Sequence, residues 1–234
     1  MDLLNFEVVA DYWHVFLRGL GITVLLTLST MVLATVLAIP VALARMSEYR
    51  LIRWPANVFV EFMRATPLIL QLIYIYYVLP TAGIKLDPIT AAITGLTLHY
   101  GAYLSEVFRG GIQSIPKGQT EAAFALGLSY WLAFRKVVLP QAFRAVLPTL
   151  GNYLISLFKD TSLASVVTVQ ELMFSGQIIA ARNFQYFTVY TVTAILYFSV
   201  CYPSGQVVRK LEDRMRRGWV STRPEDAGVD RARA

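Results

Sequence analysis

The sequence has few of the residues that catalysis and metal binding use. Its 234 residues include one cysteine, Cys201, and two histidines, His14 and His99. One cysteine cannot form an internal disulfide or a zinc site by itself, and the histidines have no companions at metal-ligand spacing. The chain also lacks a Gly-x-x-x-x-Gly-Lys-Ser/Thr phosphate loop. We therefore expect no metal, no cofactor, no ATP hydrolysis and no enzymatic activity in this chain itself.

Charged residues are scarce as well. They make up 15% of the chain, against about a quarter in soluble domains, and 56% of the residues are hydrophobic. A bilayer core needs roughly 20 apolar residues in helical form to cross it. Uncharged runs reach or approach that length at 20–44, 65–84, 88–105 and 183–208. This pattern predicts an all-α, polytopic membrane protein.

The expected organisation is one transmembrane domain at 1–217 with about five membrane-spanning helices. An amphipathic segment at 5–18 precedes them, and a polar tail at 218–234 is predicted to be disordered in the cytoplasm. The expected spans are 19–44, 56–79, 89–108, a fourth stretch interrupted by Pro140, Pro148 and Gly151, and 186–208.

The basic residues predict the orientation, because cytoplasmic loops of membrane proteins carry an excess of lysine and arginine. With the amino terminus outside, the basic clusters at 45–53, 109–144 and 209–217 all face the cytoplasm. Of the lysines and arginines, only Arg18, Lys85 and Arg182 then lie outside. The net charge of +6 is explained by this topology, and we expect no nucleic-acid partner.

The loop at 113–140 is longer than a simple connection needs. A turn at 115–118 precedes the alanine-rich stretch 119–126, which favours a helix that Gly127 can end. Ser129 is a plausible N-cap for a second helix at 130–138, and Leu139-Pro140 is expected to bend the chain back towards the membrane. The pattern predicts two short helices at a sharp angle, which form a docking element.

The spacing of residues in this loop resembles the "EAA" loop of permease subunits in bacterial ATP-binding-cassette (ABC) importers. Glu121-Ala122-Ala123 is followed by Gly127, Val137 and Leu139-Pro140 at the family's intervals, with valine where isoleucine is commoner. In that family the loop is a coupling helix that sits in a cleft of the ATPase subunit. The resemblance implies an ATPase-docking role for Gln119, Glu121, Ala122, Ala123, Gly127, Leu139 and Pro140.

Three further segments resemble permeases of the polar amino acid (histidine/glutamine/arginine) family, and the order agrees from about 19 to 217. They are 64–68 (Arg-Ala-Thr-Pro-Leu), 102–112 and 159–163 (Lys-Asp-Thr-Ser-Leu). The stretch 152–160 also resembles ectoine/hydroxyectoine-type permeases.

The resemblance implies a multi-pass subunit of the bacterial inner membrane that imports a polar amino acid or similar zwitterion. Its expected partners are two ABC ATPase subunits that bind ATP-Mg, a second permease subunit in a homodimer or related heterodimer, a periplasmic or lipid-anchored solute-binding protein, and membrane lipid. An ion-coupled secondary transporter of small polar solutes is the alternative.

Lys159 and Asp160 are the strongest candidates for substrate contact or a gate. A charge near the bilayer centre costs about 2.5–3.5 kcal/mol, and the two side chains offer opposite charges to a zwitterion. Asn152, Thr161 and Ser162 surround them with polar groups. An internal ion pair that stabilises the fold is the alternative, although adjacent helical residues do not face each other.

Other polar residues near the spans are candidates for the same site. Gln71 and Tyr74 share a helix face, and would line the pathway or join helices. Arg64 and Glu106 are candidate gate residues, although each has an oppositely charged neighbour three residues away, Glu61 and Arg109. Gln170-Glu171 are expected near the outer face, available to an external partner.

Overall fold

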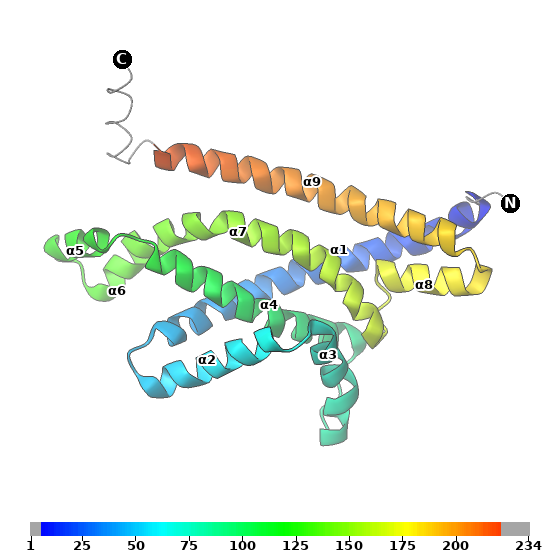
Figure 1. The fold of residues 1–234 in the computed structure, drawn as a ribbon, viewed down its shortest axis with the longest axis horizontal. Helices are drawn as coiled ribbons and strands as arrows, with labels where there is room; N and C mark the ends of the chain where they lie inside the picture. The colour runs from blue at the N-terminus through cyan, green and yellow to red at the C-terminus, as the bar shows by residue number, and fades with distance from the viewer. Residues whose placement is uncertain (1–5, 221–234) are drawn as a thin grey trace, which may run out of the picture.

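The computed structural model describes residues 6–220, with the side chains of 7–214, and these residues form helices and loops without a strand. The expected all-α fold is confirmed. In chain order the helices are α1 (Phe6–Met46), α2 (Arg50–Ala65), α3 (Leu68–Ile73), α4 (Pro88–Gln113), α5 (Lys117–Ala125), α6 (Tyr130–Ala133), α7 (Leu139–Asp160), α8 (Leu172–Asn183) and α9 (Tyr186–Val220) (Figure 1). Short helical segments of other types are η1 (Tyr74–Val78), η2 (Leu79–Ala82), η3 (Phe134–Val138) and η4 (Thr161–Val167).

The helices suit a membrane protein. Within the described residues, two helices are long and apolar enough to cross a bilayer alone, and two bent helix pairs can each add a span. The 26 residues of α4 are also long enough to cross, but this helix is more polar. It can be polar because other helices surround it.

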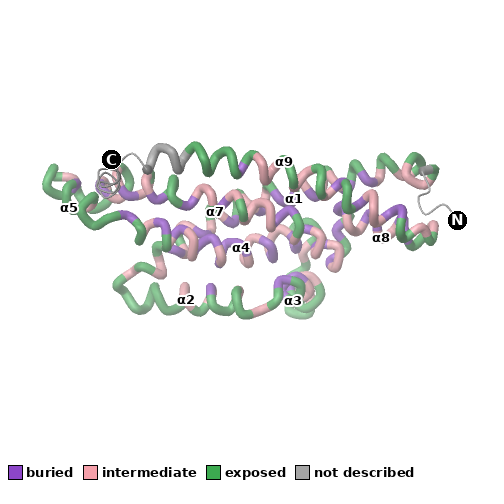
Figure 2. Tube along the Cα trace, turned by 45° about the horizontal axis from the view of Figure 1, so that its top comes forward, coloured by how far each residue is buried: buried purple, intermediate pink, exposed green. Residues whose placement is uncertain are grey.

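The helix α4 lies at the centre of the fold and contacts α1, α2, α3 and α7. Its buried residues Leu96, Leu104 and Phe108 pack in one cluster with Ala38 and Ala42 of α1. Alanines at this contact allow the two helix backbones to approach closely. Figure 2 shows buried residues along α4 and on the facing parts of its neighbours, while α2 is mostly exposed.

Asp87 fixes the start of α4. Its carboxylate accepts hydrogen bonds from the backbone N–H groups of Ile89 and Thr90 at 3.1 Å each, and Pro88 follows at the first helical position, where a missing N–H does no harm. Hydrogen bonds from Thr90 and Ile89 hold the pKa of Asp87 below its usual value. The carboxylate therefore stays charged beside the positive end of the helix.

The elements that carry the basic clusters lie at the same end of the fold, as the predicted orientation requires. The helices α5 and α6 and the last described turns of α9 lie at one end, and the amino terminus and the α8–α9 connection lie at the other (Figure 1). The predicted tail from residue 221 onward falls outside the described residues, and residues 218–220 belong to α9.

From residue 6 onward the expected amphipathic segment is continuous with the first span, because α1 continues from Phe6 to Met46 without interruption. The expectation for the second span was wrong. The second span is not continuous, because the chain turns by 107° between α2 and the helical run Leu68–Ala82. Thr66 is extended, with ψ of 140°, as expected for a residue before proline.

The interruption of the fourth stretch was also misplaced. Pro148 lies inside α7, which continues to Asp160, and the break follows at η4. Leu139-Pro140 does not bend the chain either, because α6, η3 and α7 run on as one helical segment. The π-helical turns η1 and η3 both end one residue before a Leu-Pro pair, at Pro80 and Pro140. The wider turn accommodates a proline that has no N–H to donate.

Gly19 of α1 is required by close helix packing. A Cβ added there would lie 3.0 Å from the Leu172 Cα and 3.1 Å from the Glu171 carbonyl oxygen, whereas one added at Gly21 would meet nothing within 4 Å. Backbone atoms of α8 cannot move aside as a flexible side chain can.

We predict that Gly19→Ala destabilises the protein by about 1–3 kcal/mol through overpacking, while Gly21→Ala is neutral or slightly stabilising because alanine favours helix. Thermal denaturation of the purified protein in detergent, followed by size-exclusion chromatography, compares the two. Equal melting temperatures for both variants would show that the α1–α8 contact is looser than described.

Candidate functional site

The predicted docking element is a helix with an exposed face. In α5, Glu121, Ala122 and Ala125 are exposed and Ala123 is buried, and the helix folds back against η3. Gln119 accepts a hydrogen bond from Gln141 of α7 at 3.3 Å. The alanines on the open face leave room for another backbone to approach.

The predicted end of this helix at Gly127 is confirmed. Gly127 has φ of +76°, and its N–H donates to the Phe124 carbonyl while the Leu128 N–H donates to the Ala123 carbonyl. These two bonds are those of a Schellman motif. Ser129 occupies the N-cap position of α6, as expected, but its side chain makes no capping hydrogen bond.

Exposed aromatic residues beside α5 were missed by the sequence analysis. Phe124, Tyr130 and Trp131 are 44%, 75% and 63% exposed, and the Phe124 and Tyr130 rings stack at 6.4 Å. The sequence feature that could have revealed them is that large aromatic residues follow a polar turn. A groove of about 670 Å³ runs beside them between the end of α1 and η3, lined among others by Leu43, Met46, Ile115, Tyr130, Trp131 and Phe134. Exposed apolar patches of this kind mark interaction sites.

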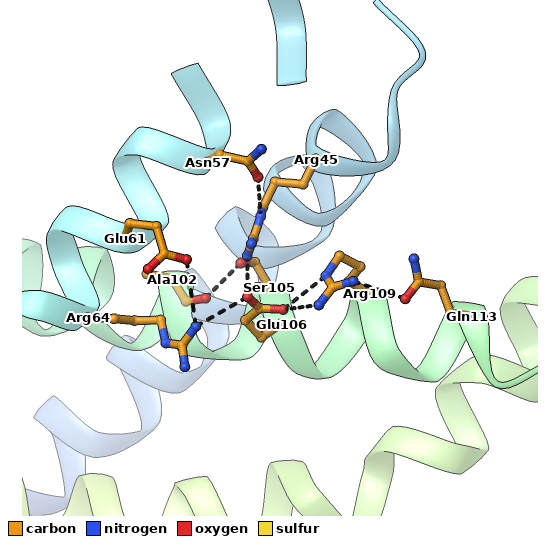
Figure 3. Close-up of polar contacts among 9 residues, drawn as sticks. All are labelled: Arg45, Asn57, Glu61, Arg64, Ala102, Ser105, Glu106, Arg109 and Gln113. Carbon is orange, nitrogen blue, oxygen red and sulfur yellow. Dashed lines mark hydrogen bonds and ion pairs between the residues drawn. The ribbon is translucent and has the colours of Figure 1, made fainter. Parts of the chain in front are cut away.

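Glu106 is the centre of an ion-pair cluster that joins three helices (Figure 3). Its Oε1 lies 2.7 Å from Nη1 of Arg45 in α1 and 3.3 Å from Nη1 of Arg64 in α2. Its Oε2 accepts from Arg109 of α4 at 2.7 and 2.9 Å. Asn57 of α2 accepts from Nε of Arg45 at 2.8 Å. The predicted pair of Glu106 and Arg109 is present, as one part of this larger cluster.

Arg64 is the most loosely held member of the cluster. Its side chain is 41% exposed, and its contact with Glu61 is long, at 4.0 Å. The guanidinium carbon also lies 5.7 Å from the centre of the Tyr103 ring, a distance at which cation and ring attract each other. Arg64 therefore links the ion-pair cluster to the aromatic residues in the middle of α4.

Asp160 lies on the far side of these aromatic residues, a group we call the tyrosine cluster: Tyr100 and Tyr103 of α4 and Tyr153 of α7. The Tyr100 hydroxyl donates to Asp160 at 2.6 Å. Tyr153 lies 6.2 Å from each of the other two rings. A carboxylate and aromatic faces together can hold a cationic group.

Lys159 faces different surroundings from Asp160. It lines a groove of about 320 Å³ with Ser162 and residues of α8 and α9, among them Met173, Thr193 and Tyr197. Among the described residues, no carboxylate lies within ion-pair distance of Lys159. The structure therefore separates the two charges that the sequence placed side by side.

The remaining candidate residues are dispersed. The Thr161 hydroxyl is buried and donates to the Phe158 carbonyl at 2.7 Å. Tyr74 is 56% exposed on η1, and Asn152 is exposed on α7. Gln71 is buried at the corner between α2 and α3. Apart from Asp160 at the tyrosine cluster and Arg64 and Glu106 in the ion-pair cluster, the candidates do not form one site.

Glu171 was misplaced by the sequence analysis. It is fully buried and caps α8, accepting from the N–H groups of Met173 and Phe174 at 2.8 Å each and from the Tyr197 hydroxyl of α9 at 2.8 Å. It is therefore not available to an external partner, although its neighbour Gln170 is exposed.

Comparisons with known proteins show the family to which the chain belongs. Residues 32–217 match the family "binding-protein-dependent transport system inner membrane component". The chain is 40% identical to the probable amino-acid ABC transporter permease YckA of Bacillus subtilis (strain 168), over 85% of this chain and 88% of that protein. It is 43% identical to the glutamine transport system permease GlnP of Escherichia coli (strain K12), over 70% and 77%.

The fold is also that of solved transporters. A crystal structure of an amino acid ABC transporter with histidines superposes with a TM-score of 0.84 and 32% identity, over 90% of this chain and 99% of that one. The MetNI methionine ABC transporter, in an inward-facing conformation, superposes with a TM-score of 0.69 at 20% identity, over 86% and 98%.

We predict that Glu106→Gln destabilises the protein by about 3 kcal/mol, because it leaves Arg45, whose side chain is 8% exposed, without its counter-charge. Glu61→Gln is the control, since an exposed pair contributes less than about 1 kcal/mol. Thermal denaturation in detergent measures both, and a Glu106→Gln protein as stable as Glu61→Gln would contradict the role of the cluster.

Proposed function

The chain belongs to the family of binding-protein-dependent transport system inner membrane components and is the transmembrane permease subunit of an ABC importer, and we propose that it carries a polar amino acid. Family membership implies an ATPase and a solute-binding protein as partners. The ion-coupled carrier considered from the sequence has no support among the relatives and structures above, none of which is described as such a carrier.

The observation that carries the proposal is the placement of Asp160, the last residue of α7, beside the tyrosine cluster. An amino acid has an ammonium group that a carboxylate and ring faces attract. On the other side of the cluster, Arg64 supplies a guanidinium that matches the geometry of a carboxylate. The relatives YckA, a probable amino-acid permease, and GlnP, a glutamine permease, support the same substrate class.

Energy enters through the docking element. The proposed assembly has two permease subunits, in a homodimer or related heterodimer, and two ATPase subunits. Each ATPase subunit binds α5 of one permease subunit. The exposed Glu121, the small residues around it and the aromatic residues Tyr130 and Trp131 support this contact. The helix α5 lies between α4, which carries Glu106, and the helical segment that leads through α7 to Asp160. Movement of α5 is therefore passed on to α4, which carries Glu106, and to the segment of α6, η3 and α7 that ends at Asp160.

We predict that Asp160→Asn lowers uptake at least tenfold and that Lys159→Met has a smaller effect, because only Asp160 lies at the tyrosine cluster. Proteoliposomes that contain the permease, its ATPase and its binding protein are tested with radiolabelled glutamine, histidine, arginine, glutamate and cystine. Asp213→Asn, at the exposed end of α9, is the control. Near-parental uptake by Asp160→Asn would remove this residue from the pathway.

We also predict that Glu121→Lys lowers recovery of the ATPase subunit at least tenfold when the permease is purified by an affinity tag, since the changed residue is exposed on α5. Glu212→Lys makes the same charge change on the exposed end of α9 and is expected to leave recovery unchanged. If both variants retain the ATPase equally, the docking surface lies elsewhere.

A further inference from the structure

The corner between α2 and α3 leaves backbone groups without helical partners. Thr66 and Pro67 separate the two helices, so the last carbonyls of α2 have no N–H groups one turn ahead to accept from. Within a membrane protein such groups must find partners inside the protein. At this corner a side chain supplies them.

That side chain is Gln71, which is 7% exposed. Its Nε2 lies 2.9 Å from the Met63 carbonyl, 3.1 Å from the Thr66 carbonyl and 2.7 Å from the Thr66 hydroxyl oxygen. The Thr66 hydroxyl donates its own proton to the Phe62 carbonyl at 2.8 Å. All of these atoms are therefore acceptors for the amide, and the orientation of the Gln71 amide follows from them.

The amide orientation determines the protonation of His99 on α4. Gln71 Oε1 lies 3.1 Å from His99 Nδ1, and an amide oxygen can only accept. His99 Nδ1 must therefore carry the proton in this contact. The imidazole also packs 5.0 Å from Tyr103 and 5.7 Å from Tyr100. His99 thus holds the corner to the central helix, next to the tyrosine cluster.

The corner also carries the segment that follows it, 68–82, which we call the arm. In Figure 1 the arm leaves the bundle at the α2–α3 corner. Its Tyr77 hydroxyl donates to the Val166 carbonyl at 3.1 Å, and its Tyr76 hydroxyl lies 3.4 Å from the Thr168 hydroxyl. Both partners lie in or directly after η4, the segment that follows Asp160. The angle at the corner therefore sets, together with the packing of α3 on α4 and η4, how Tyr76 and Tyr77 meet η4.

We propose that His99 is the positioning residue of the arm: its Nδ1–H orients Gln71, Gln71 holds the α2–α3 corner, and the corner sets the contact of Tyr76 and Tyr77 with η4. The inference deepens the proposed transport function, because the arm and η4 adjoin the Asp160 site. His99 itself need not touch the substrate.

Two substitutions separate the hydrogen bond from the packing of the ring. The amide nitrogen of asparagine can take the place of Nδ1–H, whereas that of glutamine lies near the position of Nε2. We therefore expect His99→Asn to preserve the corner and His99→Gln to lose it. Thr94→Val, on the same helix, is the control, since the Thr94 hydroxyl donates only to the Thr90 carbonyl of its own helix.

The corner is measured by the distance between spin labels on α2 and on the arm. Labels at Val58→Cys and Val78→Cys, both partly exposed, are introduced into a Cys201→Ala chain and measured by double electron–electron resonance in lipid nanodiscs. We expect the parental distance in His99→Asn and Thr94→Val, and a shifted or broadened distribution in His99→Gln. This measurement needs no ATPase, binding protein or substrate. Its outcome therefore does not depend on whether the uptake experiments succeed.

A parental distance in His99→Gln overturns the proposal, and so does an altered distance in His99→Asn, which would show that the ring itself holds the corner. If His99→Gln does not accumulate in the membrane, His99→Asn decides: a parental distance supports the proposal, because asparagine keeps the donor but not the ring.

Discussion

The structure depends on one constraint: every backbone polar group at membrane depth needs a partner within the protein. The chain breaks its helices at residues 66–67 and again at residues 168–171, between η4 and α8, and at each break a buried side chain pairs with backbone groups. Gln71 donates to the carbonyls at the end of α2, and Glu171 accepts from the first N–H groups of α8. The named backbone groups at both breaks therefore have partners within the protein.

These capping side chains also connect helices that are far apart in sequence. Gln71 contacts His99 of α4, and Glu171 accepts from Tyr197 of α9. Each break is thus tied to a long neighbouring helix, so that its angle depends on that helix. Discontinuous helices of this kind are where transporters place their binding sites. In this chain the first break contacts the tyrosine cluster through Gln71 and His99, and η4 connects Asp160 to the second.

The charged residues divide into two groups with different roles. Glu106 is shared by three arginines, which joins α1, α2 and α4 near the docking end of the fold. Among the residues that the structure describes, Asp160 accepts a hydrogen bond from the Tyr100 phenol alone, and so keeps capacity for a further donor. A cluster that is already satisfied stabilises the fold, whereas a carboxylate with spare acceptor capacity suits a transient ligand. Arg64 lies between the two and is the least constrained of the arginines.

The sequence by itself determined the features that depend on local composition and spacing. Apolar runs predicted helices that cross a membrane, and the basic clusters predicted which loops lie on the same side of it. Gly127 predicted the end of α5, because the left-handed backbone conformation at a helix end favours glycine. The spacing around Glu121 indicated the family. Such signals are readable because each depends on residues within a few helical turns.

Tertiary structure decided the rest, because it depends on which helices meet. Pro67 breaks a span and Pro148 does not, and no local signal separates the two. The adjacent residues Lys159 and Asp160 point to different neighbours, so their shared position in the sequence did not make a shared site. His99 looked isolated until α3 placed Gln71 beside it, and Glu171 looked exposed until α1 and α9 enclosed it. The role of a polar side chain in a helical membrane protein is set by the helix opposite, which lies far away in the sequence.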